Sequence, residues 1–202
     1  AVLAAALAGL ALSVVIERLM TPRLPMARPL AAWALHGGSW LSAYATLTLV
    51  LGRPWFAAAA VSAFLLMLVL VNNAKFKALR EPFVFQDYEY FTDAIRHPRL
   101  YIPFLGWGKF LAATAGFVLA VAVGLWMEEA PVQRLAWSGQ LGGIAVVFGG
   151  GALLLLAGSW KRLPVSFEPV RDVRALGLLA SLWRYAQEEG TPLAVASPFD
   201  FL

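Results

Sequence analysis

Long uncharged stretches alternate with short charged segments along this chain. Five runs contain no Asp, Glu, Lys or Arg, and they cover residues 1–16, 29–52, 54–74, 110–127 and 135–160. Each run is close to or above the ~17 to 25 apolar residues that a helix needs to cross a bilayer. The runs lack the alternation of a β-barrel, and an isolated strand cannot satisfy its backbone in lipid. The pattern therefore predicts five transmembrane helices.

Composition supports a membrane protein. Of the 202 residues, 60% are apolar and 14% are charged, whereas an ordinary soluble domain has roughly one quarter charged residues. A soluble protein with five such runs would have too little polar surface to cover them. We therefore predict an all-α integral membrane protein whose five-helix transmembrane domain covers residues 1–160. The net charge of +4 points to membrane phospholipid as a partner and not to nucleic acid, for which no motif is present.

The segment between the third and fourth predicted helices, residues 75–109, has a different character. It mixes six basic and four acidic residues with several Phe and Tyr residues, and this aromatic content is not typical of a disordered linker. Asp87 can cap a short helix that shows Tyr88, Phe91 and Ile95 on one face and stops before Pro98. We expect this loop to lie at the membrane interface, with the aromatic face of its helix toward lipid.

The end of the third helix and this loop carry groups that suit a lipid headgroup. Cations and amphipathic aromatic side chains at the interface can bind phosphate and glycerol. The candidate headgroup-binding residues are Asn72, Asn73, Lys75, Lys77, Arg80, Tyr88, Tyr90, Arg99 and Tyr101. The alternative interpretation is that these residues only anchor the helix at the interface.

Two features inside the predicted spans indicate helix packing. Gly139 and Gly143 form a small-xxx-small pair on the fifth helix, which predicts close packing within the bundle or a face for a second copy or another membrane subunit. His36 lies in the second helix beside Trp33 and Trp40. A hydrogen bond from His36 to a neighbouring helix is more common than a functional role at such a position.

Catalytic motifs are absent from the sequence. There is no cysteine, no GxSxG, no HExxH and no glycine-rich phosphate loop. The carboxylates of residues 75–109 match no EF-hand, and the neighbouring Lys and Arg residues are sufficient to pair with them. We therefore assign no catalytic residue, no metal ligand and no cofactor to these 202 residues.

Residues 161–202 are predicted to be a linker that contains an amphipathic helix. Polar and apolar positions favour a helix from about Asp172 to Glu188, which Gly190 and Pro192 would end. The residues after Pro192 resemble an extended connection. We expect the natural chain to continue past Leu202 into another domain.

A family resemblance appears in two runs, Val71 to Glu89 and Arg96 to Gly106. The first contains Asn-Asn-Ala-Lys-Phe-Lys and the second begins Arg-His-Pro-Arg. Together they resemble the segment after the third membrane helix of lipoteichoic acid synthase-like proteins of Gram-negative bacteria, which are sulfatase-like phosphoglycerol transferases of the alkaline phosphatase superfamily. The resemblance implies five membrane helices, a linker helix and a later extracytoplasmic domain with the nucleophilic threonine and a divalent metal, commonly manganese.

The resemblance implies a multi-pass protein of the bacterial cytoplasmic (inner) membrane that anchors such an enzyme and positions its lipid donor. A non-enzymatic accessory subunit of a larger membrane complex is the alternative, and a transporter is less consistent with spans that hold no formal charge. Orientation stays open. The family topology would place the loops after the first and third helices outside, whereas their many Lys and Arg residues predict an inside location by the positive-inside rule.

Overall fold

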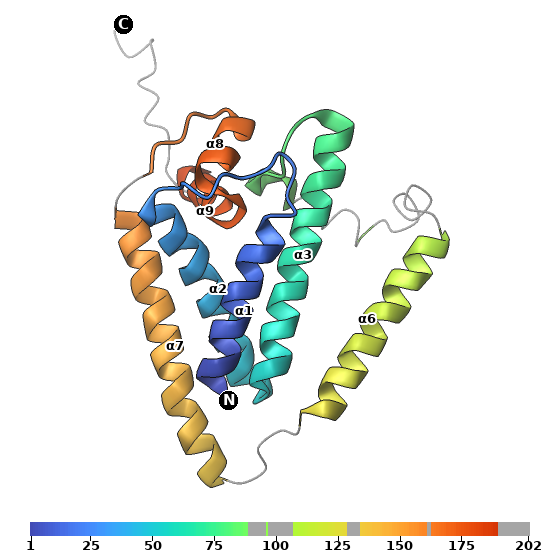
Figure 1. Cartoon of the computed structure of the whole chain (residues 1–202), viewed down its shortest axis with the longest axis vertical. Helices are drawn as coiled ribbons and strands as arrows, with labels where there is room; N and C mark the ends of the chain where they lie inside the picture. Colours follow the sequence, from blue (N-terminus) through green and yellow to red (C-terminus); the bar gives the residue numbers. More distant parts are fainter. Residues whose placement is uncertain (89–95, 97–106, 129–133, 161–162, 190–202) are drawn as a thin grey trace, which may run out of the picture.

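The computed structural model describes residues 1–88, 96, 107–128, 134–160 and 163–189. Its elements are α1 (Val2–Glu17), α2 (Leu30–Leu51), α3 (Pro54–Leu79), the 3-10 turn η1 (Phe85–Asp87), α6 (Trp107–Met127), α7 (Arg134–Trp160), α8 (Pro169–Leu176) and α9 (Leu178–Glu189). The described residues contain no strand, which confirms the predicted all-helical class. Each of the five long helices covers nearly all of one of the five uncharged runs, and α3 continues beyond its run to Leu79 (Figure 1).

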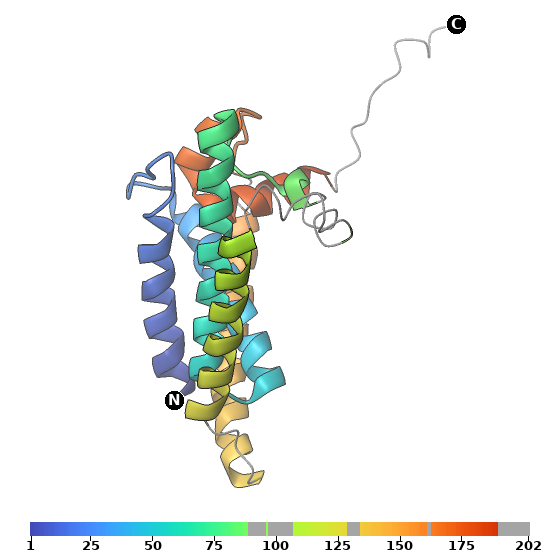
Figure 2. The ribbon, with the colours of Figure 1, turned by 90° about the vertical axis from the view of Figure 1, so that its right-hand side faces the viewer.

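The long helices run alternately up and down. The C-terminal ends of α1, α3 and α7 and the start of α2 lie at the same end of the molecule as α8 and α9, and the chain begins at the opposite end (Figure 1). Figure 2 shows from the side that α8 and α9 lie beside the upper end of α3. α2 packs against α7 and α3, and α1 packs against α3. α6 diverges from α3 toward its N-terminal end (Figure 1) but contacts α3 near its C-terminal end, where a Cβ on Gly124 would collide with the Phe56 ring.

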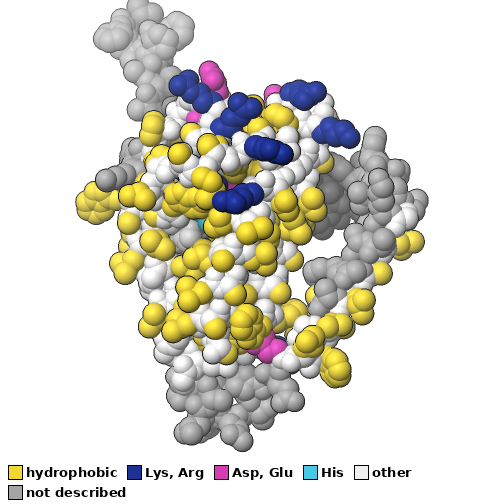
Figure 3. All heavy atoms as spheres, in the orientation of Figure 1, with side chains coloured by type: hydrophobic (Ala, Val, Ile, Leu, Met, Phe, Trp, Pro, Cys, Tyr) yellow, Lys and Arg dark blue, Asp and Glu magenta, His cyan; other side chains and the backbone are white. Residues whose placement is uncertain are grey.

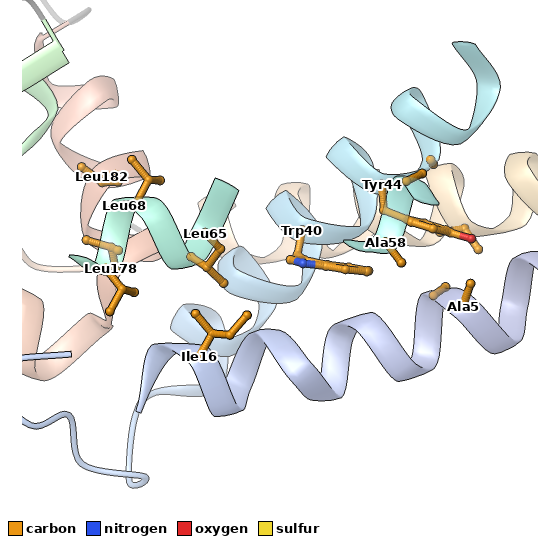
Figure 4. Packing of buried hydrophobic residues seen from close by; sticks show 14 of the residues in the cluster. Ala5, Ile16, Trp40, Tyr44, Ala58, Leu65, Leu68, Leu178 and Leu182 are labelled. Atoms are coloured by element: carbon orange, nitrogen blue, oxygen red, sulfur yellow. The ribbon is translucent and has the colours of Figure 1, made fainter. Parts of the chain in front are cut away.

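Two stacked aromatic rings form the centre of the core. The rings of Trp40 and Tyr44 on α2 have centroids 5.4 Å apart and an interplanar angle of 8°, and both side chains are buried between α1 and α3 (Figure 4). The Tyr44 hydroxyl donates a hydrogen bond to the backbone oxygen of Val2, at 2.8 Å. A Cβ on Gly9 would collide with the Trp40 ring, so glycine is what lets α1 lie against this stack.

Glycines also allow α2 and α7 to approach closely. A Cβ on Gly38 of α2 would lie 2.8 Å from the backbone oxygen of Gly151, and a Cβ on Gly158 would lie 2.9 Å from the backbone oxygen of Ala31. Small residues at such crossings are typical of helices packed in membranes. Of the predicted pair, Gly143 lies against Val2, whereas a Cβ on Gly139 would meet no atom within 4 Å.

Two helices are long and apolar enough to cross a membrane by length and composition. They are Pro54–Leu79, which is α3, and Gly139–Trp160, which is the described apolar part of α7. α1 is apolar but has only 16 residues, and α2 has 22 residues that include several polar ones. The structure therefore supports a membrane protein with two candidate spans, and the crossing of α1, α2 and α6 stays a prediction.

The outer surface is consistent with this conclusion. Large apolar side chains point outward along the helices, including Leu7 (71% exposed), Val50 (73%) and Leu153 (68%). Polar side chains such as Ser13, Thr48 and Ser62 are buried between the helices. Figure 3 shows apolar side chains over the flanks of the molecule, an arrangement that suits lipid better than water.

The predicted amphipathic helix from Asp172 to Glu188 is two helices in the structure, and this prediction was wrong. α8 ends at Leu176, α9 begins at Leu178, and Gly177 between them has φ 87°. Residues with an L side chain rarely adopt this conformation. The break folds α9 back against α2 and η1, and it buries Leu178 and Leu182 in the same core as Leu68 (Figure 4).

The loop from residue 75 begins later than its polar sequence suggested. α3 continues through Lys75 and Lys77 to Leu79, and Arg80 ends it with φ 61°. After the buried Phe83, the chain forms the single turn η1. The predicted interfacial helix after Asp87 falls mainly on residues 89–95, which lie outside the described residues.

Candidate functional site: a basic end above a buried polar centre

Exposed cations gather at the end of the molecule where α8 and α9 lie. Residues 17–28, 75–88 and 163–189 contain six exposed cations and three exposed carboxylates. The cations are Arg18, Arg23, Lys77, Arg80, Arg171 and Arg174, and the carboxylates are Glu81, Glu168 and Glu189. Figure 3 shows dark blue Lys and Arg side chains at this end and apolar side chains below it. We call this surface the basic end.

Asn72 and Asn73 support the basic end from beneath. The Asn72 amide donates to the backbone oxygen of Thr21 (2.8 Å) and accepts from the backbone N–H of Phe83 (2.8 Å). Asn73 accepts from the N–H of Thr21 (2.6 Å) and donates to the backbone oxygen of Leu19 (2.8 Å). The two amides thus fix the chain after α1 and, through Asn72, the chain after α3. Asn72 is fully buried, so its contacts here are structural.

The other candidate headgroup residues have different surroundings. Lys75 forms an ion pair with Asp87 at 2.6 Å, and Asp87 also accepts the backbone N–H of Val84. Lys77 and Arg80 are exposed. Tyr88 is 40% exposed and its ring contacts Phe83 and Phe85. The remaining three candidates, Tyr90, Arg99 and Tyr101, lie outside the described residues.

Burial raises the pKa of the Tyr88 hydroxyl above its usual value. The phenol is therefore neutral at pH 7 and can donate a hydrogen bond to an anionic oxygen. Lys77 and Arg80 supply positive charge, so these three residues of the candidate set have the chemistry that a phosphate requires. Whether any of the nine residues binds a lipid stays a prediction.

A buried polar centre lies directly below the basic end. Glu17, the last residue of α1, has no exposed surface. One carboxylate oxygen accepts a hydrogen bond from the Arg28 guanidinium at 2.7 Å, and the other accepts from the backbone N–H of Leu178 at 2.7 Å. The guanidinium also lies over the Trp33 ring, 4.4 Å from its centroid. Glu17 thus joins α1, the chain before α2 and the first turn of α9.

Glu17 caps α9 in the manner of an N-cap residue. The first N–H groups of a helix lack partners within the helix, and a carboxylate near that end is favoured by the helix dipole. A Cβ on Gly177 would collide with the Arg28 guanidinium and would lie 2.8 Å from a Glu17 carboxylate oxygen. Gly177 therefore supplies both the turn and the space that the Arg28–Glu17 pair occupies.

His36 extends this centre toward α1. Its Nε2 lies 3.0 Å from the Ser13 hydroxyl oxygen, which confirms the predicted hydrogen bond to a neighbouring helix. Because the Ser13 hydroxyl donates to the Leu10 backbone oxygen at 2.7 Å, it accepts from His36. The other ring nitrogen, Nδ1, lies 3.4 Å from Glu17, at a geometry too poor for a hydrogen bond.

A catalytic triad places a serine, a histidine and an acidic residue side by side in this spatial order, as do Ser13, His36 and Glu17. These three side chains do not form an active site here. Ser13 and Glu17 are fully buried and His36 is 1% exposed, so substrate cannot reach the hydroxyl in this conformation. The Ser13 proton is directed at Leu10 and not at His36. The Glu17 carboxylate is neutralised by Arg28. The cluster is a structural network at the junction of α1, α2 and α9.

Polar contacts also stabilise the fold of α8 and α9. The buried Asp172 carboxylate accepts from the Ser166 N–H (2.9 Å), from the Ser166 hydroxyl (2.7 Å) and from the Tyr185 hydroxyl (2.9 Å). Burial and the neighbouring Asp172 raise the pKa of Tyr185 well above its usual value. Arg184 donates to the Leu163 backbone oxygen and pairs with Glu188. These contacts fix α8 and α9 as a folded cap on the bundle.

Comparisons with known proteins add no identification, because no family model matches this chain and no curated protein or solved structure is significantly similar to it. No three His, Asp or Glu side chains come together as a metal site within the described part of the chain. The expected manganese site belongs, by the resemblance, to a later domain and stays a prediction.

Proposed function

We propose that this chain is the membrane domain of a sulfatase-like phosphoglycerol transferase, and that its basic end binds the phosphate headgroup of an anionic phospholipid donor. The observation that carries this proposal is the set of six exposed cations that three separate segments bring to one end of an otherwise apolar bundle. A cluster of this size attracts anionic lipid headgroups. The sequence resemblance supplies the reaction class, and catalysis would belong to the later domain.

Contacts within the protein that hold together the cation-bearing segments of the basic end support the proposal. Asn72 ties together the segments that carry Arg23 and Lys77, and Glu17 ties the cap that carries Arg171 to the same end. Charges held on a fixed scaffold lose less conformational entropy when they bind a ligand. The phosphate and glycerol of the donor would then be presented to an extracytoplasmic domain on the same side.

Lipid binding by charge-neutralising variants tests the proposal. The protein is placed in nanodiscs of phosphatidylcholine, and bound phosphatidylglycerol is measured as its fraction rises. Lys77→Gln together with Arg80→Gln should weaken binding by up to about 1 kcal/mol for each lost cation. Glu81→Gln, an exposed change of opposite sign at the same end, should strengthen it. Equal affinity of wild type and both variants would refute the proposal.

An accessory subunit of a larger membrane complex is the second candidate function, and one feature of α7 favours it. A Cβ on Gly139, Gly142, Gly149 or Gly150 would meet no atom within 4 Å. This open row of small residues could receive a partner helix. Stable co-purification of another membrane protein, lost in Gly149→Leu, would support this function, whereas a monodisperse wild-type chain in mild detergent would argue against it.

A further inference from the structure

One ring nitrogen of His36 has no hydrogen-bond partner inside the buried polar centre. Because the Ser13 hydroxyl donates its proton to the Leu10 backbone oxygen, it accepts from Nε2 of His36. A neutral imidazole at this position therefore carries its proton on Nε2 and a lone pair on Nδ1. Nδ1 lies 3.4 Å from Oε2 of Glu17 and makes no hydrogen bond. Two acceptor atoms thus face each other with no proton between them.

A proton on Nδ1 would turn this nitrogen into a donor that points at a carboxylate. Imidazole is the side-chain group that ordinarily gains charge as the pH falls from about 8 to about 5. Oε2 of Glu17, however, already accepts a hydrogen bond from the Arg28 guanidinium at 2.7 Å. Protonated His36 would therefore place a second cation against one carboxylate oxygen. The centre would change from a neutral ion pair to a cluster with net positive charge.

Within the described residues, the elements around His36 bring no second carboxylate to balance this charge. Glu17 is the only charged residue of α1. The spans of the other packed helices contain no charged residue, over residues 30–51, 54–74 and 135–160. The carboxylates of α8, α9 and the residue before α8 are either exposed or bound elsewhere, which applies to Glu168 and Glu189 and to Asp172 and Glu188, respectively. From α9, the group that meets Glu17 is the backbone N–H of Leu178, which has partial positive charge at a helix N-terminus.

Docking of the cap formed by α8 and α9 makes an additional positive charge harder to accommodate. With the cap in place, Glu17 has no exposed surface and His36 is 1% exposed, and a buried charge without a counter-charge is costly. The positive N-terminus of α9 also lies against the carboxylate that both cations would share. Movement of the cap away from the bundle would remove this N-terminus and admit water to Glu17. Proton uptake by His36 and docking of the cap therefore oppose each other.

We propose that His36 is a pH-sensitive switch for the cap, and that α8 and α9 dock less tightly on the bundle when Nδ1 of His36 takes up a proton. The cap carries Arg171 and Arg174, two of the six exposed cations of the basic end. Acidification would therefore loosen part of that surface. This inference concerns the fold alone, and it does not depend on lipid binding by the basic end.

Hydrogen exchange of the cap tests the switch. The whole chain is placed in nanodiscs of phosphatidylcholine, and protection factors, which compare each exchange rate with that of an unfolded peptide at the same pH, are measured from about pH 8 to about pH 5. Protection of α9 should fall on acidification, by at most about tenfold for each pH unit, the limit for uptake of one proton. His36→Gln keeps a donor for Ser13 but cannot take up a proton, so its α9 protection should stay nearly constant. His97→Gln, which replaces the other histidine of the chain, is the matched control and should behave as the wild type does.

Three results of this experiment would overturn the switch. The first is α9 protection that does not change with pH in the wild type. The second is the same loss of α9 protection in a folded His36→Gln protein as in the wild type. The third is an equal loss of protection in α7, because the whole bundle and not the cap would then be opening.

The position of the proton provides a second test, which needs no substitution of His36 and holds even if His36→Gln does not fold. In the His97→Gln protein, His36 is the only histidine, and nitrogen NMR of isotope-labelled histidine distinguishes a protonated ring nitrogen from a bare one. At the high end of the pH range, we expect a proton on Nε2 and none on Nδ1. On acidification, Nδ1 should become protonated over the same pH range in which α9 loses protection. A neutral ring with its proton on Nδ1, or an Nδ1 that stays bare throughout, would overturn the proposal.

Discussion

At the scale of single residues, Glu17 shows how a charge can be accommodated inside an apolar bundle. Its carboxylate has a cation on one side and a helix N-terminus on the other, so both oxygens are bound although the side chain is fully buried. Burial of an unpaired charge would be very costly. The arrangement works because Arg28 and the N–H of Leu178 approach different oxygens.

Removal of the Glu17 charge should strongly destabilise the fold. Glu17→Gln leaves the Arg28 guanidinium, whose side chain is 1% exposed, without a counter-charge. We expect the free energy of unfolding to fall by about 3–5 kcal/mol, measured by denaturation in detergent. Arg18→Gln, at the adjacent exposed position, should change it by less than about 0.5 kcal/mol. The double variant Glu17→Gln with Arg28→Met should recover part of the loss. Equal stability of the single variants Glu17→Gln and Arg18→Gln would contradict this prediction.

Tyr185 should give the cap a defined pH dependence. Its pKa in the fold is raised above the ordinary ~10 of a tyrosine, so its stabilising contribution is complete below about pH 10 and is lost as pH rises through the higher folded pKa. Tyr185→Phe removes the hydrogen bond to Asp172 and should cost about 1–2 kcal/mol at pH 7. Unfolding of both proteins at pH 7, 9 and 11 should give equal differences at pH 7 and 9 and a smaller one at pH 11.

At the scale of elements, the glycines of α7 divide into packed and open positions. A Cβ on Gly151 would lie 2.8 Å from the Ser42 hydroxyl oxygen and 3.0 Å from the Ser42 backbone nitrogen, whereas Gly149 and Gly150 have nothing within 4 Å. Neighbouring residues of identical type thus have opposite surroundings. Only the packed glycine determines how close α2 and α7 can lie.

Substitution of these glycines should separate the two roles. Gly151→Leu should push α7 away from α2 and lower the free energy of unfolding by about 1–3 kcal/mol, as overpacking does elsewhere. Gly149→Leu should leave it unchanged or slightly raise it, because a longer side chain on a helix favours helical backbone. Thermal unfolding in detergent measures both. A larger loss for Gly149→Leu than for Gly151→Leu would contradict the observed packing.

The sequence predicted the long helices well because charged residues mark their ends. α2 lies within the uncharged run between Arg28 and Arg53, and α6 ends where Glu128 begins a charged segment. The continuation of α3 past Lys75 was missed because a lysine at a helix C-terminus looks the same as a lysine in a loop. Here Asp87 neutralises it, and sequence spacing alone gives no sign of this pairing.

The tertiary contacts could not be predicted from local pattern. The break at Gly177 depends on Glu17 and Arg28, which are more than 140 residues away along the chain. The sequence shows Asn72 and Asn73 only as polar groups at the end of an apolar run, whereas in the structure both side chains bind backbone. Glu17 itself was visible as the charge that ends the first apolar run, but its partner at Leu178 was not.

At the scale of the whole molecule, the exposed cations are concentrated at the basic end. The orientation of the protein in the membrane therefore decides which side of the membrane these cations occupy. The proposed function places the basic end outside the cytoplasm, whereas the positive-inside rule predicts the reverse. The chain has no cysteine, so a single introduced cysteine is the only residue of this chain that a maleimide labels through a thiol. Ala27→Cys lies at the basic end in an exposed position, and Met127→Cys, 76% exposed, lies at the other end.

Labelling of intact cells with an impermeant maleimide should distinguish the two orientations. The proposed function requires that Ala27→Cys reacts in intact cells and that Met127→Cys reacts only after permeabilisation. The opposite result would rule out presentation of the donor to an extracytoplasmic domain.

The contact between Glu17 and Leu178 also sets an order of assembly. Arg28 follows Glu17 by eleven residues and can neutralise it as soon as both have been synthesised. The N–H of Leu178 is 161 residues away, so the cap can dock only after α2, α3 and α7 have been made. Because chains emerge from the N-terminus, docking of α9 is among the last steps for the described helices, and protease resistance of the cap would mark a bundle that is complete.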